Sequence, residues 1–200
     1  MNYVPLAPEF LGLVIAAWIS CAVAKRRLVC VIAASITAFV LLFFRGAGVP
    51  SRIERTALYC PCDGTVQSII DHGMGYYQVC VFLGVTNVHV QYSPCDCTVH
   101  RIRHVRGAFH PAYLHEKSAC NERVEYEMHS AVFGRIRVVQ IAGQLARRIV
   151  PFVKVGDRLP AMARLGMIKL GSRCDVYFKG MPLVASGERV RVGDFLAQAR

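Results

Sequence analysis

The stretch Gly166-Met167-Ile168-Lys169-Leu170-Gly171-Ser172-Arg173-Cys174-Asp175-Val176-Tyr177 places a Gly-Ser pair between two short apolar runs. The dipeptide is typical of a tight turn between strands. It also permits a second interpretation, because glycine adds no side chain beside its own carbonyl carbon and the next residue supplies a hydroxyl. On a strained backbone, the Ser172 oxygen could attack the Gly171 carbonyl, break the chain and leave a pyruvoyl group. The dipeptide alone does not decide between these interpretations.

Outward from this stretch, the chain after residue 56 carries many short runs of β-branched and aromatic residues, separated by Gly, Pro and Asp. This pattern predicts a mainly β, compact sandwich or barrel-like domain. Expected strands include residues 75–83, 87–92, 135–141 and 172–178. Residues 143–149 are the one segment with a helix-like pattern.

A short internal repeat adds to the β prediction. Val155-Gly156-Asp157-Arg158-Leu159 recurs as Val192-Gly193-Asp194-Phe195-Leu196. Each copy predicts a hairpin turn at Gly-Asp, of the kind found in lipoyl-like β domains.

Charge and composition restrict the class of partner. The chain has 24 basic and 13 acidic residues, a net charge of +11, and 54% hydrophobic residues. A strongly basic charge together with so many hydrophobic residues is typical of proteins that bind either nucleic acid or anionic lipid. Zinc-finger spacing and aromatic–basic RNA-binding motifs are absent. The composition therefore favours a membrane partner and no nucleic acid.

The N-terminal region predicts a hydrophobic helical membrane anchor. Residues 10–24 and 28–44 are uncharged, and Lys25-Arg26-Arg27 separates them. Each run is close to the length of roughly 17–25 residues that spans a bilayer. A cleavable signal peptide fits poorly, because Glu9 replaces a basic start. We therefore expect an anchor at residues 1–50 and a catalytic domain at residues 51–200.

Basic residues near the two apolar runs leave the topology undecided by the positive-inside rule. Cysteine usage favours the cytoplasmic face of the cell (inner) membrane for the catalytic domain. The nine cysteines are odd in number and several lie in apolar runs, which predicts reduced, buried thiols. Cys60-x-Cys62 and Cys95-x-Cys97 have tighter spacing than structural zinc sites use, so no metal is expected.

Several further segments, in order along most of the chain, resemble the phosphatidylserine decarboxylase family in its short bacterial form. They are residues 43–45, Pro61-Cys62-Asp63-Gly64-Thr65-Val66, Asn87-Val88-His89-Val90, residues 116–118 with 121–123, Val138-Val139-Gln140-Ile141-Ala142-Gly143 with 146–149, and residues 166–177. Two positions depart from the family pattern. Asn87 stands where an aspartate is usual, and Tyr92 stands where longer members have an additional histidine.

The resemblance implies a proenzyme that cuts itself between Gly171 and Ser172. A β chain, residues 1–171, and an α chain, residues 172–200, would stay together as a heterodimer, and higher oligomers are possible. Ser172 would become a covalent pyruvoyl group that forms a Schiff base with phosphatidylserine. Loss of carbon dioxide would then give phosphatidylethanolamine, without pyridoxal phosphate or a metal.

The residues themselves suggest how the cut is activated. A serine hydroxyl is a weak nucleophile until a base removes its proton. His89 lies in an apolar run, where burial and neighbours can tune its pKa, and is the candidate base. Asp63, beside a glycine, could orient the imidazole as the third member of a relay. Without the family context, a core histidine and a plain Asp-Gly turn explain both residues.

Other functions and residues remain open at this stage. A membrane adaptor with a lipoyl-like β domain would leave Gly171-Ser172, His89 and Asp63 without a role. A self-processing decarboxylase of another amino-group substrate would leave the apolar N-terminus unexplained. Arg147 and Arg148 are candidates for binding the phosphate or carboxylate of the substrate. The alternative bases are the histidines at positions 72, 100, 104, 110, 115 and 129.

Overall fold

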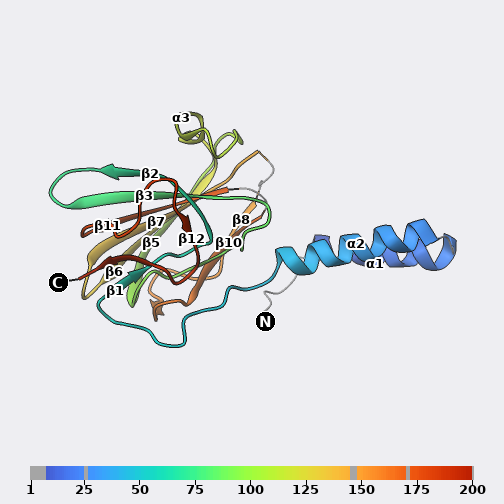
Figure 1. Ribbon diagram of the computed structural model, residues 1–200, viewed down its shortest axis with the longest axis horizontal. Coiled ribbons are helices and arrows are strands. Elements are labelled where there is room, and N and C mark those ends of the chain that lie inside the picture. Colours follow the sequence, from blue (N-terminus) through green and yellow to red (C-terminus); the bar gives the residue numbers. More distant parts are fainter. Residues whose placement is uncertain (1–7, 25–26, 145–147, 170–171, 200) are drawn as a thin grey trace. The chain divides into compact units, whose positions relative to one another are not determined.

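The computed structural model describes residues 8–24, 27–144, 148–169 and 172–199. The chain divides into two compact units, residues 1–47 and 48–200. Helices α1 (Pro8–Ala24) and α2 (Arg27–Phe43) make up the first unit, and strands β1 to β13 with helix α3 make up the second (Figure 1). The second unit is mainly β, as the residue pattern predicts.

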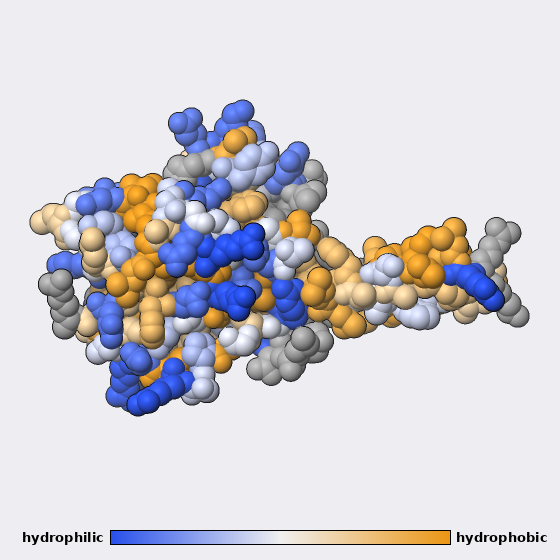
Figure 2. Space-filling model, viewed as in Figure 1, coloured by the Kyte–Doolittle hydropathy of each residue, from blue (hydrophilic) through white to orange (hydrophobic). Residues whose placement is uncertain are grey.

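Helices α1 and α2 coincide with the two apolar runs of the sequence. They pack as an antiparallel pair, in which Trp18 Nε1 donates a hydrogen bond of 3.0 Å to Thr37 Oγ1. Large apolar side chains cover much of their outer surface (Figure 2), with Ile19 58% and Leu28 71% exposed. Each helix has 17 residues. Among the described helices, none combines the length and apolar character needed to cross a bilayer.

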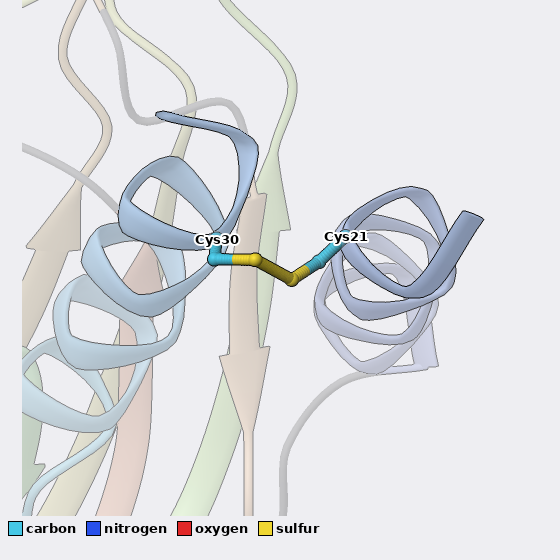
Figure 3. Close-up of a disulfide and its surroundings, with 2 residues drawn as sticks. All are labelled: Cys21 and Cys30. Carbon is cyan, nitrogen blue, oxygen red and sulfur yellow. A yellow bond between two sulfur atoms is a disulfide. The ribbon is translucent and has the colours of Figure 1, made fainter. Parts of the chain in front are cut away.

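A disulfide joins the two helices, between Cys21 of α1 and Cys30 of α2 (Figure 3). The prediction of reduced thiols is therefore wrong for this pair. In the β unit the other seven cysteines are free, and all except Cys120 are buried. Burial raises the pKa of the Cys80 thiol to about 12, so that this thiol stays protonated at neutral pH.

The described strands of the β unit form three antiparallel sheets. The largest has the strand order β12-β2-β3-β11-β7-β6-β5-β9, a second has β4-β10-β8, and the third pairs β1 with β13. The strands of the large sheet are β2 (Gly64–Asp71), β3 (Tyr76–Leu83), β5 (Cys97–Val105), β6 (Arg123–Ser130), β7 (Gly134–Ile141), β9 (Arg158–Leu159), β11 (Ser172–Lys179) and β12 (Arg189–Val190). The smaller sheets comprise β4 (Val90–Tyr92), β8 (Arg148–Pro151), β10 (Arg164–Lys169), β1 (Ala57–Tyr59) and β13 (Phe195–Gln198).

Alternation along the strands places the core on one face of the large sheet. On β11, Cys174, Val176 and Phe178 point into the main hydrophobic cluster. Residues of the small sheets, such as Leu58, Ile168 and Leu196, complete this cluster from the other side. The arrangement is sandwich-like, with Arg173 and the other alternate residues of β11 on the outer face.

The two Gly-Asp segments form turns, but neither turn is a hairpin between paired strands. Gly156 and Gly193 have φ values of +94° and +93°, which glycine adopts without strain. Each aspartate side chain caps its own turn, as Asp194 Oδ2 accepts a bond of 2.7 Å from Arg191 N. The turns carry the chain from one sheet to another, from β8 to β9 and from β12 to β13.

The helix-like pattern at residues 143–149 does not correspond to a helix in the described part of this segment. Arg148 and Ile149 begin strand β8, which pairs with β10. Ile149 is buried in the core and Arg148 is exposed, an alternation typical of a strand. Residues 145–147, and with them Arg147, lie outside the described residues.

Candidate functional site

Ser172 is the first residue of β11 and lies at the boundary between two sheets. Strand β10 ends at Lys169 in the three-stranded sheet, and β11 begins at Ser172 in the eight-stranded sheet. Gly171 lies outside the described residues. The Ser172 side chain is fully buried, on the core side of β11. The proposed cut therefore falls on the short link that joins two layers of the domain.

The Ser172 hydroxyl has no hydrogen-bond partner among the described residues. Leaving such a group buried without a partner costs about 1–3 kcal/mol, so that proteins seldom keep one without a functional reason. A buried, unpartnered hydroxyl is suited to react with a neighbouring carbonyl. This feature fits the origin of a pyruvoyl group at position 172.

His89 lies next to the strand that leads to Ser172. Its backbone oxygen accepts a hydrogen bond of 3.1 Å from Ile168 N, and Val90 pairs with Met167. The His89 side chain is fully buried. Pairing of β4 with β10 thus brings the His89 backbone beside the last residues of β10, which precede the Gly-Ser pair.

The tautomer of His89 follows from its ring contact. Nδ1 lies 2.8 Å from the carbonyl oxygen of Asn87, and a carbonyl can only accept, so Nδ1 carries the proton. In the neutral imidazole, Nε2 is then the nitrogen with the lone pair. The side chain of Asn87 is used elsewhere, because its Oδ1 accepts a bond of 2.9 Å from Gly84 N in the turn that follows β3.

A relay would require Asp63 to contact the imidazole of His89, but the contact that the structure shows for its side chain is with a backbone amide. Its Oδ1 accepts a hydrogen bond of 2.9 Å from Val192 N, in the turn between β12 and β13. Asp63 and Asn87 line the same cavity of about 680 Å³, together with Arg189 and Arg191. The structure thus places Asp63 on the same cavity as Asn87, whose carbonyl oxygen contacts the His89 ring. A role of Asp63 in a relay with His89 stays a prediction.

A buried chain of polar side chains beside this site was not found by sequence reasoning. Tyr126 Oη donates to Gln140 Oε1 at 2.6 Å, and Gln140 Nε2 donates to Gln91 Oε1 at 2.5 Å. All three are fully buried. Burial raises the pKa of the Tyr126 phenol well above its ordinary value, so that it remains a donor. The signal was present, since Gln91 lies between Val90 and Tyr92 and Gln140 lies between Val139 and Ile141.

Gly166 packs against the polar chain of Tyr126, Gln140 and Gln91, where only a residue without a Cβ atom fits. Gly166 pairs with Gln91, and a Cβ atom there would lie 2.8 Å from Tyr126 Oη, 2.9 Å from Gln140 Oε1 and 2.9 Å from Val150 O. These distances are shorter than van der Waals contact allows. Any larger residue must therefore displace the polar chain or the backbone of β8.

Replacement of Gly166 by alanine is expected to destabilise the protein by about 1–3 kcal/mol, the usual cost of overpacking a dense interior. Urea unfolding measures this as a lower midpoint. Gly48→Ala is a matched control, because a Cβ at Gly48 meets nothing within 4 Å. Equal midpoints for the two variants would contradict the close approach at Gly166.

Among the described residues, no group of three or more His, Cys, Asp or Glu side chains is placed to hold a metal ion. Cys60 Sγ donates to Cys62 O instead, at 3.1 Å. Cys97 Sγ lies 3.2 Å from Ser93 Oγ.

Comparison with known proteins identifies a family for the chain. The family model described as phosphatidylserine decarboxylase matches residues 36–198. A phosphatidylserine decarboxylase proenzyme of Streptomyces avermitilis is 38% identical over 176 residues, covering 86% of this chain and 80% of the relative. One of Solidesulfovibrio magneticus is 40% identical over 164 residues, covering 78% and 77%.

A third relative differs in its named lipid. The protein of Methanosarcina barkeri carries the provisional name archaetidylserine decarboxylase proenzyme, and is 38% identical over 164 residues, covering 81% of this chain and 77% of the relative. Matches of this extent show the family. The chain belongs to the phosphatidylserine decarboxylase family.

Proposed function

We propose that the chain is a self-cleaving proenzyme that decarboxylates phosphatidylserine to phosphatidylethanolamine and carbon dioxide. One observation carries the assignment of the site. The buried hydroxyl of Ser172 has no partner among the described residues. Ser172 also begins β11 shortly after the end of β10, the strand that pairs with the His89 segment. Membership of the family supports the reaction.

The cut requires an acyl shift from nitrogen to oxygen. Ser172 Oγ bonds to the Gly171 carbonyl carbon as the Gly171–Ser172 C–N bond breaks, which gives an ester and a free amine. Removal of the Ser172 α proton then expels the Gly171 carboxylate and leaves dehydroalanine. Water releases ammonia and leaves the ketone of a pyruvoyl group. His89 Nε2, the accepting nitrogen of the neutral ring, is our candidate for the base that takes the Ser172 proton.

The α chain would remain bound because its strands pair with strands of the β chain. β11 lies between β3 and β7, with Ser172–Lys179 paired along the whole of β3. β12 pairs with β2, and β13 pairs with β1. These pairings bury Cys174, Val176 and Phe178 in a core shared by both products.

The pyruvoyl carbonyl would take up the substrate amine and accept electrons as carbon dioxide leaves. The chain's own residues have the other tasks. The sheets around Ser172 exclude water, and the Asn87 carbonyl fixes the ring of His89 so that Nε2 can move a proton. The cavity bordered by Asp63, Asn87, Arg189 and Arg191 has charges of both signs, which suits a headgroup with two anionic groups and one ammonium group.

Membrane association is the second part of the proposal. We propose that α1 and α2 insert their exposed apolar surfaces into the cell membrane, with the β unit on the cytoplasmic face. The net charge of +11 favours an anionic lipid surface. Each helix of 17 residues extends about 25 Å at 1.5 Å per residue, less than the hydrocarbon thickness of about 30 Å. Insertion as a shallow pair therefore suits their length.

Intact-mass analysis of the purified full chain tests the proposed function. We expect two fragments, divided after Gly171, with a pyruvoyl group at position 172 of the shorter one. Vesicles that contain phosphatidylserine should then yield phosphatidylethanolamine. An uncut 22.2 kDa chain with an unmodified serine would favour a non-catalytic adaptor. A cut chain that decarboxylates only a soluble amine would overturn the lipid substrate.

A further inference from the structure

The polar loop between β5 and β6 makes a contact that the proposed cleavage does not explain. Helix α3 (His115–Ser118) lies in this loop, and Ser118 is fully buried. Ser118 Oγ accepts a hydrogen bond of 2.6 Å from Arg173 Nη1, across a sequence separation of 55 residues. The loop thus reaches the residue that directly follows the proposed cut.

Asn121 holds the loop in place for this contact. Its Nδ2 donates 2.8 Å bonds to His110 O and to Ala142 O, and its Oδ1 accepts one of 2.8 Å from His110 N. Asn121 is itself fully buried. Ser118 is therefore presented from a fixed loop.

Arg173 is bound on its other edge by a carboxylate. Its Nε donates to Asp175 Oδ1 at 2.8 Å and its Nη2 to Asp175 Oδ2 at 3.0 Å, which is a two-pronged ion pair. The two side chains are only 4% and 2% exposed. Gln78 Nε2 of β3 donates a further 2.9 Å bond to Asp175 Oδ2. This network lies on the outer face of the large sheet, opposite to the side chain of Ser172.

The network joins the two products of the cut. Arg173 and Asp175 belong to the shorter product, whereas Ser118 and Gln78 belong to the longer one. Before cleavage, the covalent link to β10 restrains the start of β11. After cleavage, residue 172 is a chain end, and chain ends at the edge of a pairing fray unless they are held. Pairing of β11 with β7 begins at Arg173, whereas pairing of β11 with β3 begins at Ser172. Among the described residues, Ser172 therefore pairs on one side only, with Leu83.

We propose that Arg173 is a positioning residue, which through Asp175 and Ser118 holds residue 172 in place at the start of β11 after the chain is cut. This inference rests on the proposed function. Before the cut the covalent chain performs the same task, so the contact matters for turnover and not for cleavage. A purely structural role for the ion pair would instead affect folding and both reactions together.

The test uses Arg173→Lys in the full-length chain. Lysine keeps the positive charge but cannot form the two-pronged contact with Asp175 while also reaching Ser118. We expect complete cleavage by intact mass, a KM for phosphatidylserine vesicles within about 2-fold of wild type, and kcat per cleaved molecule at least about 10-fold lower. Guanidinium ion should raise the kcat of Arg173→Ala saturably, because it replaces the missing group.

Arg103→Lys is the matched control. Arg103 and Arg173 line the same cavity of about 360 Å³. Arg103 holds Glu125, with an Nη2 to Oε2 distance of 2.7 Å, but it lies in β5 and belongs to the longer product. It should keep a wild-type kcat. Ser118→Ala removes one bond without leaving a charge and should lower kcat in the same direction as Arg173→Lys.

The outcomes separate the two proposals. A cut wild type whose Arg173→Lys and Ser118→Ala variants turn over at the wild-type rate overturns the positioning role alone. The same holds if the variants lose only the extent of cleavage, with unchanged kcat per cleaved molecule. An uncut wild type would sink the proposed function, and this inference with it.

Discussion

Replacement of Ser172 by alanine is expected to leave an uncut chain of about 22.2 kDa that does not decarboxylate phosphatidylserine. Alanine lacks the hydroxyl that attacks the Gly171 carbonyl and cannot become a ketone, so both reactions lose their reacting atom. Because the Ser172 hydroxyl has no partner among the described residues, its removal also breaks no recorded hydrogen bond. The variant should therefore fold normally. Intact mass and a vesicle assay measure the two losses.

Ser186→Ala is the control for this variant. Ser186 also belongs to the proposed α chain, but its Oγ is exposed and donates to Gln67 O at 3.0 Å. It should be cut and should turn over as the wild type does. Ser172→Cys keeps a nucleophile at the site and should be cut at least in part. Fragments divided after Gly171 in the alanine variant would place the attacking group on another residue.

The residue pattern predicted the strands well, because alternation and turn residues are local signals. The expected strand at 172–178 is β11, Ser172–Lys179, and the expected strand at 75–83 is β3, Tyr76–Leu83. The helix-like pattern at 143–149 gave the wrong element, because residues 148 and 149 belong to β8, whose conformation is set by its pairing with β10. The Gly-Asp turns were located correctly, but which strands they join depends on the sheets and is not local.

For the site, the sequence singles out candidates only where a residue's own side chain suggests chemistry. Ser172 and His89 stand out because of their side chains and because the segments around them resemble those of a family. Gln91 meets Gln140 across 49 residues, and Arg173 meets Ser118 across 55. Such contacts depend on strand register and on the path of a loop, and one sequence does not show either. The number and spacing of the cysteines do not show the Cys21–Cys30 disulfide, because it depends on how α1 and α2 face each other.

Replacement of His89 by asparagine is expected to lower the rate of cleavage, of turnover or of both by about 10²–10⁴-fold, the usual contribution of a positioned acid or base. Asparagine can still donate a hydrogen bond to the Asn87 carbonyl, which His89 Nδ1 holds at 2.8 Å. It has no nitrogen lone pair in the place of Nε2. The variant therefore separates the proton-transfer role of His89 from its structural role.

Two measurements assign the loss. The rate of cleavage is followed by intact mass after synthesis of the chain, and kcat is then taken per cleaved molecule. His104→Asn is the control, since His104 is half exposed and pairs with Glu122 at 3.0 Å. It should behave as the wild type in both measurements.

The pattern of loss in His89→Asn decides how one histidine serves two reactions. Slow cleavage with normal kcat makes His89 the base for the cut alone. Normal cleavage with low kcat makes it the proton donor or acceptor in decarboxylation alone. A loss in both is our expectation, because Tyr92 stands where longer family members have an additional histidine, and His89 is the histidine recorded beside β10 in the described chain. Wild-type rates in both measurements would move the base to another residue.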